Sequence, residues 1–577
     1  MSITKSTSRS GVRSGGQLVV DALQVHGVEF IFGVPGESYL PVLDALHDSP
    51  IRFIINRQEG GSAFMAEAYG KLTGKPGICF VTRGPGATNA AIGVHTAQQD
   101  STPMILFIGQ VGNDFVEREA FQEIDYRRMY GTMAKWVAQI DRADRIPEYI
   151  AHAFQVATSG RPGPVVLALP EDCLSAQASV ADTRAYTAIQ AAPSIAQTAL
   201  IRNYLAEAKR PVVILGGGGW NQAACSHIAQ FIEANHLPTG CAFRFQDLLA
   251  NTHPNYIGDI GIGINPKLAQ RIKDADLILA IGPRLGEMTT SGYSLLETPV
   301  PKQKLIHIHS DALELGRVYQ GELMINSGMP QIAEVLSQME PVNSDAWHHT
   351  VSDAKSELLA WQTEPAIFAQ EQAPLNLWQL VRHLQQACPA DTIITNGAGN
   401  YATWAHRYFQ YGGFRTQLAP TSGAMGYSMP SAIAAKIVQP ERTVVVFAGD
   451  GEYLMNGQEL ATAVQYQAGV IILVFNNGMY GTIRMHQEKT FPGRVSGTQL
   501  HNPDFAALAR AYGASGEVVE KTDDFAPALS RALAHTREQN LPALIELRYD
   551  GNLITPGASL HNLRQQALAN KLPIGCQ

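Results

Sequence analysis

The sequence predicts an α/β fold built from three doubly wound domains, each containing a parallel β-sheet. Two observations support this prediction. Short apolar runs of strand length alternate with amphipathic helical patterns along most of the 577 residues. Two polar stretches, residues 174–200 and 340–375, interrupt this alternation and have the composition of linkers. Because a chain of this length exceeds what one hydrophobic core can serve, several domains are expected.

The two linkers divide the chain into successive parts. In the central part, residues 212–215 and 277–281 are clear apolar strands. The predicted parts are a flexible tail (1–15), an N-terminal domain (16–175), a central Rossmann-like domain (195–340), a C-terminal domain (375–550) and a C-terminal tail (551–577).

The composition argues against several classes of partner. Hydrophobic residues make up 45% of the chain, charged residues make up 16%, and the net charge is −8 without a basic stripe. This balance argues against nucleic acid and anionic membrane surfaces as partners. The apolar runs fall far short of the roughly 20 residues that span a bilayer, so no membrane segment is predicted.

The cysteines and the N-terminus are typical of a cytoplasmic protein. Six cysteines are scattered without a CxxC pair, as expected for reduced thiols. The first 15 residues are rich in Ser and Arg and lack the apolar run of a secretion signal. We interpret them as a frayed tail in preference to an organelle transit peptide.

The most informative segment of the chain is a βαβ unit in the C-terminal part. An apolar strand (443–448) leads into the turn Gly449-Asp450-Gly451, and a helix from Asn456 to Gln467 is expected next. A second apolar strand (470–475) is followed by Asn476-Asn477. In such a unit both turns lie at the carboxyl edge of adjacent parallel strands, where open α/β sheets bind ligands.

The residues of these two turns suit a metal ion that holds a diphosphate. Asp450 supplies a carboxylate and Asn477 an amide oxygen, which are ligands for a hard cation. Mg²⁺ takes few protein ligands and completes its shell with water and substrate phosphates. Gly449 and Gly451 allow the backbone to approach a diphosphate closely. Each turn by itself is ordinary, so the interpretation depends on their order and spacing.

Further motifs accompany this unit along the chain. They are Phe32-Gly33-Val34-Pro35-Gly36, Glu59-Gly60 with Ala66-Glu67-Ala68-Tyr69-Gly70, Gly84-Pro85-Gly86-Ala87-Thr88-Asn89, Ala120-Phe121-Gln122-Glu123, Gly160-Arg161-Pro162-Gly163-Pro164 and Met425-Gly426. With these motifs the chain, from about residue 15 to 550, resembles the acetohydroxyacid (acetolactate) synthase-like branch of thiamine diphosphate (ThDP)-dependent enzymes.

The resemblance implies a role for each domain. The N-terminal domain would bind the pyrimidine of ThDP, and the C-terminal domain would bind its diphosphate and Mg²⁺. One ThDP must then bridge two domains, which in this family come from different subunits. The resemblance therefore implies a homodimer or homotetramer with active sites at the subunit interface.

Glu59 matches the acid that the family uses to activate the cofactor through pyrimidine N1′. Such an acid must keep its proton near neutral pH, and an apolar pocket favours the protonated form. The position of Glu59 at the start of a helix favours the anion instead. We expect burial to dominate.

The resemblance also implies the other site residues. Met425 would wedge between the two rings of the cofactor, and the carbonyl of Gly423 would accept a hydrogen bond from its amino group. The implied cofactor-binding residues are Pro35, Pro85, Asn89, Gly399, Asn400, Tyr401, Gly423, Met425, Gly449, Gly451, Glu452 and Met479, the implied metal residues are Asp450, Asn477 and Met479, and the implied catalytic residues are Glu59, Gln122, His486 and Glu37.

Three residues depart from the family pattern and make the expected substrate pocket more polar. Glu37 and Arg83 stand where the family has small residues. His486 stands where the family carries the Trp that selects a larger second 2-oxo acid. His95 or Gln98, on the helix after Asn89, could also contact the substrate.

A flavin in the central domain is left open. The family has an acidic residue for FAD in a Gly-Asp turn, but this chain has Asn326-Ser327-Gly328, although Arg284 is retained. For Gly216-Gly217-Gly218-Gly219 we favour a tight strand-to-helix turn without a ligand over a dinucleotide site, because the spacing of the glycines does not fit the fingerprint.

The sequence thus predicts a ThDP- and Mg²⁺-dependent enzyme, a transferase or lyase that decarboxylates a small 2-oxo acid and joins the product to a second carbonyl. A simple decarboxylase, or a lyase that cleaves a diketone or an acyl-CoA, is the alternative on the same scaffold. A non-catalytic paralogue is a third interpretation, against which the retention of Glu59, Asp450 and Asn477 argues.

Overall fold

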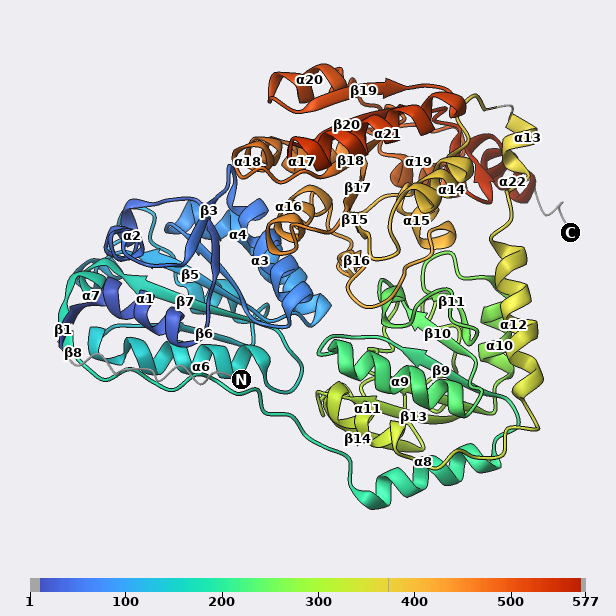
Figure 1. The fold of residues 1–577 in the computed structure, drawn as a ribbon, viewed down its shortest axis with the longest axis horizontal. Helices are drawn as coiled ribbons and strands as arrows, with labels where there is room; N and C mark the ends of the chain where they lie inside the picture. Colours follow the sequence, from blue (N-terminus) through green and yellow to red (C-terminus); the bar gives the residue numbers. More distant parts are fainter. Residues whose placement is uncertain (1–10, 372, 572–577) are drawn as a thin grey trace, which may run out of the picture.

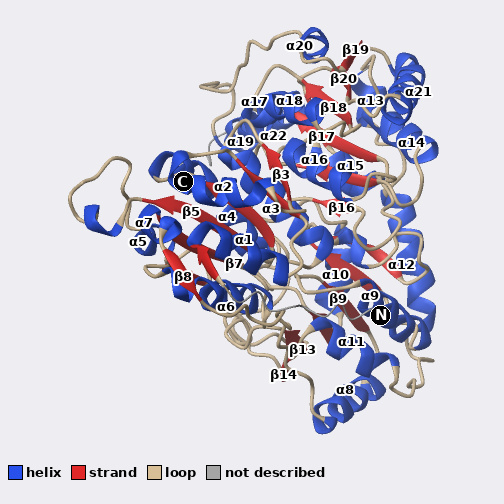
Figure 2. Cartoon of the chain, turned by 60° about the vertical axis from the view of Figure 1, so that its left-hand side comes forward, coloured by secondary structure: helices blue, strands red, loops and turns tan. Residues whose placement is uncertain are grey.

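A computed structural model describes residues 11–371 and 373–571. The described chain contains three six-stranded parallel sheets, one for each predicted domain, and Figure 1 shows the three domains grouped around a common junction. Figure 2 shows the strands of each sheet enclosed between helices. The predicted fold class is therefore confirmed.

The N-terminal domain has the strand order β3-β2-β4-β5-β7-β6. Its strands are β2 (Phe30–Gly33), β3 (Arg52–Ile55), β4 (Gly77–Val81), β5 (Met104–Gln110), β6 (Trp136–Gln139) and β7 (Pro164–Pro170). Its helices are α1 (Gly15–Val25), α2 (Leu40–His47), α3 (Glu59–Thr73), α4 (Gly84–Asp100), α5 (Tyr126–Tyr130), α6 (Ile146–Thr158) and α7 (Glu171–Ser175).

The central domain has the order β11-β10-β9-β12-β13-β14. Its strands are β9 (Pro211–Leu215), β10 (Thr239–Ala242), β11 (Tyr256–Ile260), β12 (Leu277–Ile281), β13 (Lys304–His309) and β14 (Leu323–Asn326). Its helices are α8 (Ile195–Glu207), α9 (Gln222–Ala234), α10 (Pro266–Asp274), α11 (Met329–Ser337) and α12 (His348–Trp361).

The C-terminal domain has the order β16-β15-β17-β18-β20-β19. Its strands are β15 (Ile393–Asn396), β16 (Gln417–Leu418), β17 (Val444–Gly449), β18 (Ile471–Asn476), β19 (Ser515–Val519) and β20 (Ala543–Arg548). Its helices are α13 (Ile367–Glu371), α14 (Leu377–Ala387), α15 (Ala402–Tyr408), α16 (Ser428–Val438), α17 (Asp450–Asn456), α18 (Leu460–Gln465), α19 (Gly481–Thr490), α20 (Phe505–Ala511), α21 (Thr522–Glu538) and α22 (Leu560–Lys571).

The strands form where the sequence is continuously apolar, because helices cover both faces of a parallel sheet. All residues of β12 and of β17 are buried, as expected for central strands. One apolar core joins α3 and α4 of the N-terminal domain to α16 of the C-terminal domain. Within one chain, these two domains therefore pack directly against each other.

The structure corrects three details of the expected organisation. Val12–Ser14 forms β1 and pairs with β8 (Gln177–Ser179), so the expected tail at 1–15 is ordered from there on, while residues 1–10 lie outside the described residues. The stretch 340–375 contains the helices α12 and α13. Residues 551–571 hold the hairpin β21 (Leu553–Thr555) and β22 (Ala558–Ser559) and then α22.

The helix after the Gly-Asp-Gly turn also begins earlier than expected. It starts at Asp450 itself and ends at Asn456, which had been expected to cap its start. The polypeptide then makes a short 3₁₀ turn and a second helix, α18. In the described part of the chain, no helix is long and apolar enough to cross a membrane.

Candidate cofactor site and active-site surface

The two turns of the βαβ unit meet at the carboxyl edge of the C-terminal sheet. Strands β17 and β18 pair in parallel with Gly449 opposite Phe475, so Asp450 and Asn477 follow at the same edge. The carboxylate of Asp450 accepts a hydrogen bond from the backbone N–H of Gly478 at 2.8 Å. The expected convergence of the two turns is therefore present.

Asp450 is held by a set of donors around its carboxylate. Oδ1 accepts from the backbone N–H of Gly451 at 2.9 Å, and Oδ2 accepts from the Asn502 side chain at 2.8 Å. Burial raises the pKa of Asp450, while the hydrogen bonds from Gly451 and Asn502 act in the opposite direction. Sequence reasoning missed Asn502, because no motif signal marks this asparagine 52 positions after Asp450.

A cavity of about 230 Å³ opens beside Asp450. Its lining includes every cofactor and metal residue predicted in the C-terminal domain, namely Gly399, Asn400, Tyr401, Gly423, Met425, Gly449, Asp450, Gly451, Glu452, Asn477 and Met479. Tyr549 also lines it, and its hydroxyl accepts a hydrogen bond from the Asn477 side chain at 3.1 Å. We call this space the cofactor cavity.

The residues of the cofactor cavity fit a diphosphate and a hard cation. A Cβ on Gly451 would lie 2.5 Å from the ring of Tyr480, so only glycine allows this close turn. Gly423 has φ of +67°, a conformation that favours glycine. Asp450 and Asn477 offer hard oxygens, and Met479 can contribute only its backbone carbonyl because a thioether is a soft ligand.

No group of three or more His, Cys, Asp or Glu side chains that could hold a metal occurs among residues 11–371 and 373–571. A cation between Asp450 and Asn477 would therefore complete its shell with water and with the oxygens of its ligand, as Mg²⁺ does beside phosphates.

Glu452 lines the cofactor cavity, but its carboxylate is occupied by protein donors. It accepts hydrogen bonds at 2.9 Å from the Ser428 hydroxyl and from the backbone N–H of Gly426. The Asn456 side chain donates to the carbonyl of Gly426 at 2.8 Å. Burial raises the pKa of Glu452 to about 7. Glu452 therefore fixes the turn that presents Met425.

The segment that carries Gly423 and Met425 is anchored by the N-terminal domain. Asp100 accepts a hydrogen bond from the backbone N–H of Thr421 at 2.7 Å. The ammonium of Lys71 lies 2.5 Å from Asp100 and donates to the carbonyl of Ala419 at 2.9 Å. Residues 419–427 are thus held by Lys71 and Asp100 of the N-terminal domain and by Glu452 of the C-terminal domain.

A second buried carboxylate, Glu67, extends this network. Its oxygens accept from the hydroxyls of Thr102 at 2.7 Å and of Tyr427 at 2.5 Å. Burial raises the pKa of Glu67 to about 7, and the neighbouring Lys71 acts against that rise. Through Glu67, the motif Ala66–Gly70 therefore contributes to the contact between the N-terminal and C-terminal domains.

The predicted pyrimidine-binding residues gather on the N-terminal domain. Glu59 is the first residue of α3 and is partly buried, and its carboxylate accepts a hydrogen bond from the Asn89 side chain at 3.0 Å. Pro85 lies on the same helix as Asn89. The carbonyl of Gln122 accepts from the backbone N–H of Gly84 at 2.9 Å, which places the Gln122 loop at the start of α4.

Glu37 and Arg83 form a charged cluster on the same sheet edge. The Arg83 guanidinium lies 3.3 Å from the Glu37 carboxylate and also pairs with Glu171. These residues follow the carboxyl ends of β2, β4 and β7. Sequence reasoning identified Glu37 and Arg83 but missed Glu171, since its proximity depends on the strand order of the sheet.

Within one chain, the predicted residues around Glu59 lie apart from the cofactor cavity. No described residue of the N-terminal domain lines the cofactor cavity, so neither Glu59 nor Pro35 does. One chain therefore carries two separate partial sites, one around Asp450 and one around Glu59.

His486 lies on α19 and is exposed to a larger cavity of about 1040 Å³, which we call the substrate cavity. Gly399, Asn400, Gly423 and Thr482 line both this cavity and the cofactor cavity. His95 lines it as well, whereas Gln98 does not and donates to the carbonyl of Thr132.

Arg284, the retained flavin-site residue, also lines the substrate cavity and donates to the backbone and side-chain oxygens of Gln99 at 2.8 and 3.1 Å. The Gly216–Gly219 turn packs tightly, since a Cβ on Gly216 would lie 2.7 Å from Ala242.

Comparison with known families matches each domain in turn. The model described as "Thiamine pyrophosphate enzyme, N-terminal TPP binding domain" matches residues 13–129, the central-domain model of the same enzymes matches 199–338, and the C-terminal TPP binding domain matches 397–547. Thiamine pyrophosphate is another name for ThDP.

Three relatives are similar over almost the whole chain. The acetolactate synthase isozyme 2 large subunit of Escherichia coli (strain K12) is 32% identical and the alignment covers 95% of this chain and 98% of the relative. Isozyme 1 of the same organism is 30% identical, with 97% and 99% covered. A probable acetolactate synthase large subunit of Methanocaldococcus jannaschii is 29% identical, with 96% and 95% covered. With these matches on all three domains, the chain belongs to the thiamine pyrophosphate enzyme family and is acetolactate synthase-like.

Proposed function

We propose that the protein is a ThDP- and Mg²⁺-dependent enzyme that decarboxylates a small 2-oxo acid and joins the remaining carbons to a second carbonyl. The observation that carries this proposal is the cofactor cavity, in which Asp450 and Asn477 meet beside a glycine-lined cradle at the end of β17 and β18. When bound, ThDP supplies the carbanion chemistry that such a reaction requires.

The chain's own residues bind, orient and hold protons around that cofactor. Asp450 and Asn477 would hold the cation, and through it the diphosphate. The turn at Gly423 and Met425, fixed by Glu452, shapes the pocket for the rings. Glu59, whose carboxylate accepts a hydrogen bond from the Asn89 side chain, would exchange a proton with the pyrimidine of the cofactor.

A second copy of the chain would complete each site, as a homodimer or homotetramer. The partial site around Glu59 and the cofactor cavity are separate in one chain, which supports this arrangement. Apolar side chains are exposed beside both partial sites, with Ile92 41% exposed on α4 and Leu454 and Met455 45% and 46% exposed on α17. Burying these side chains against a second copy would be favourable. The cytoplasm remains the proposed location.

The donor is proposed to be a small 2-oxo acid such as pyruvate, with a polar or undemanding acceptor. His486, which lines the substrate cavity, stands where the family carries the Trp that selects a larger acceptor. A lyase acting on an elongated anionic substrate such as an acyl-CoA is the second candidate, since the substrate cavity is large and Arg284 and Lys489 line it.

The test begins with the purified protein, ThDP and Mg²⁺. Release of CO₂ from a panel of 2-oxo acids, with identification of the carboligation products, is expected to show turnover with pyruvate. A diketone and an acyl-CoA are assayed in parallel, and turnover of these alone would support the lyase. A protein inactive on every substrate would be the non-catalytic paralogue. Analysis of small molecules released on denaturation decides whether FAD is bound.

A further inference from the structure

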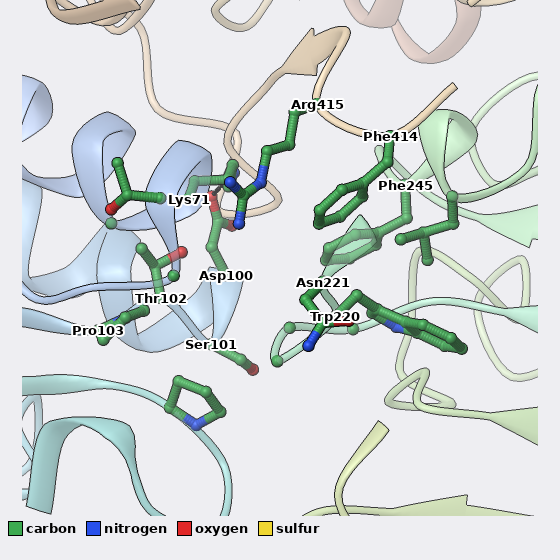
Figure 3. Close-up of a pocket in the computed structure, with 18 of the residues that line it drawn as sticks. Lys71, Asp100, Ser101, Thr102, Pro103, Trp220, Asn221, Phe245, Phe414 and Arg415 are labelled. Carbon is green, nitrogen blue, oxygen red and sulfur yellow. Dashed lines mark hydrogen bonds and ion pairs between the residues drawn. The ribbon is translucent and has the colours of Figure 1, made fainter. Parts of the chain in front are cut away.

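A third cavity, of about 460 Å³, lies where the three domains meet (Figure 3). Its walls come from the ends of α3 and α4, from the Gly217–Asn221 turn before α9, and from the loops that carry Phe245 and Arg415. Neither Asp450 nor Glu59 lines it. We call it the junction cavity, and its volume falls in the range of about 300–1,000 Å³ that suits small ligands.

Arg415 is the unusual residue of the junction cavity. In the described part of the chain its guanidinium makes no hydrogen bond or ion pair; it lies 4.7 Å from the centre of the Phe414 ring, and its Nε is buried without a partner. Burial lowers the pKa of Arg415. Figure 3 shows the side chain reaching into the cavity between Asp100 on one side and Phe414 on the other. The side chain as a whole is half-buried, and a partly buried cation without an anionic partner would be stabilised by an anion bound in the cavity.

The other charged groups of the junction cavity are already occupied. Lys71 is paired with Asp100, and Arg244 donates to the carbonyls of Gly397 and Pro420. Asp247 accepts hydrogen bonds from consecutive backbone N–H groups, the nearest being that of Arg415 at 2.8 Å. The lining holds three cations and two carboxylates, which is a surplus of one positive charge. Of these cations, Arg415 is the one whose guanidinium has no hydrogen-bond or ion-pair partner in the described part of the chain.

The remaining walls of the cavity suit a flat ring. Phe245, Phe414 and Trp220 line it, and Figure 3 shows Phe414 and Phe245 close together opposite the Asp100 wall. The indole N–H of Trp220 donates to the carbonyl of Gly216 at 2.9 Å, which fixes the orientation of its ring. Aromatic walls of this kind bind planar ligands by stacking and by excluding water.

Two acceptors in the lining lack donors. The side-chain oxygens of Gln190 and Gln331 are buried without a hydrogen-bond partner. The amide nitrogen of Gln190 donates to the carbonyls of Thr158 and Gly160, which leaves its oxygen for another donor. A buried acceptor without a donor is unfavourable, so a ligand with an N–H group would fit.

We propose that the junction cavity binds a small aromatic anion with an N–H donor, whose ring packs against Phe245, Phe414 and Trp220 while its anionic group pairs with Arg415. A nucleoside monophosphate and an indole carboxylate share this chemistry. This ligand would be additional to the substrates and the cofactor of the proposed function.

The test is isothermal titration calorimetry on the full chain loaded with ThDP and Mg²⁺, using AMP, indole-3-acetate and adenosine as probes. At least one of the two anions is expected to saturate one site per chain below about 1 mM. The anion that binds more tightly shows whether the ligand is a nucleotide or an indole carboxylate. Adenosine, which has the ring without the charge, should bind at least about tenfold more weakly than AMP if AMP is that ligand.

Arg415→Gln should weaken binding of the anion by about tenfold to a hundredfold, because a charge-assisted contact is lost. Arg531→Gln, which removes an exposed arginine paired with Glu517, is the matched control and should leave binding unchanged. If Arg415→Gln does not fold, Gln190→Leu, which removes the acceptor and keeps the charge, should weaken binding in its place.

Three outcomes would overturn the proposal. The first is that neither anion saturates with the parent protein, and the second is that the anion binds the Arg415 or Gln190 variant as tightly as the parent. Asp450→Ala is expected to retain anion binding, because Asp450 lies outside the junction cavity. Loss of binding in that variant would place the anion in the cofactor cavity instead.

Discussion

Asp450 is the side chain on which the proposed metal site depends. It is the anionic group that the described part of the chain places beside Asn477, and it lies at the start of α17. Asp450→Ala should abolish Mg²⁺-dependent binding of ThDP, because the cation loses its anionic protein ligand. Calorimetric titration of ThDP in the presence of Mg²⁺ measures this. Asp523→Ala, at an exposed position early in α21, is the control, and unchanged ThDP affinity in the Asp450 variant would contradict the metal assignment.

Glu59 can be tested without disturbing the fold, since glutamine has nearly the same shape. Its carboxylate already has the Asn89 side chain as a partner. Glu59→Gln should bind ThDP about as tightly as the parent but slow exchange of the cofactor's C2 proton by orders of magnitude, because the amide cannot transfer a proton to N1′. Quenched-flow NMR of C2 hydrogen–deuterium exchange gives the rate. An unchanged rate would remove Glu59 from the mechanism.

His486 bears on the choice of acceptor. A pocket discriminates one methylene by only about 1–3 kcal/mol even when an apolar wall is present, and here the wall residue is an exposed histidine. With pyruvate as the donor, 2-oxobutyrate should gain little preference over pyruvate as the acceptor. His486→Trp should shift the product ratio toward the larger acceptor in a competition assay. A strong preference of the parent for 2-oxobutyrate would restore a biosynthetic acetolactate synthase assignment.

At the scale of elements, α19 is tied to the C-terminal helix α22 through a buried carboxylate. Glu488 pairs with Arg564 at 2.6 Å and with Arg484 at 2.5 Å and is fully buried. The hydrogen bond from Arg564 is the main cause that lowers the pKa of Glu488 to about 2. Since α19 also carries Thr482 and His486, α22 supports the wall that the two cavities share.

This link gives a stability prediction with a defined pH window. Because the folded pKa of about 2 lies below the ordinary value of 4.5, the contribution of Glu488 is present above about pH 4.5 and is lost as the pH falls toward 2. Glu488→Gln should lower the free energy of unfolding by about 3–5 kcal/mol at pH 7. This difference between the parent and the variant should become smaller as the pH is lowered. Denaturant titrations at several pH values measure it.

The matched control for this prediction is Glu520→Gln, which removes an exposed carboxylate 3.4 Å from Arg548. An exposed pair of this kind contributes about 0–1 kcal/mol, so the control should differ little from the parent. A Glu488 variant as stable as the control at pH 7 would mean that α22 is not held by this ion pair.

At the scale of the whole molecule, the separation of the two partial sites makes a prediction about assembly. The Glu59→Gln and Asp450→Ala variants are each expected to be inactive alone. When the two are unfolded together and refolded, a mixed dimer would combine Glu59 of one copy with Asp450 of the other in one intact site. Random pairing should then restore about a quarter of the parental activity.

Activity assays on the refolded mixture, with each variant refolded alone as the control, decide this point. If each active site were formed within one chain, no mixture of the two variants could regain activity. The same experiment with untreated, separately folded variants should show no recovery until subunits exchange.

The sequence by itself determined the three-sheet architecture and the meeting of Asp450 with Asn477. Both follow from local patterns, because a strand, a turn and a helix crossover fix where the next parallel strand ends. The same holds for Glu59 at the start of α3, which a helix boundary signal places. The family resemblance then supplied the roles that these positions are expected to have.

Only the tertiary structure decided which side chains support those positions. Asn502 beside Asp450, Glu171 beside Arg83, and Glu452 turned toward Gly426 are contacts between elements that the sequence leaves unconnected. The tertiary structure also shows that the Arg415 guanidinium lies against Phe414 and that its Nε has no hydrogen-bond partner among the described residues. Local periodicity sets which face of an element is buried, but the partner on the other side depends on strand order and domain packing, which only the folded chain defines.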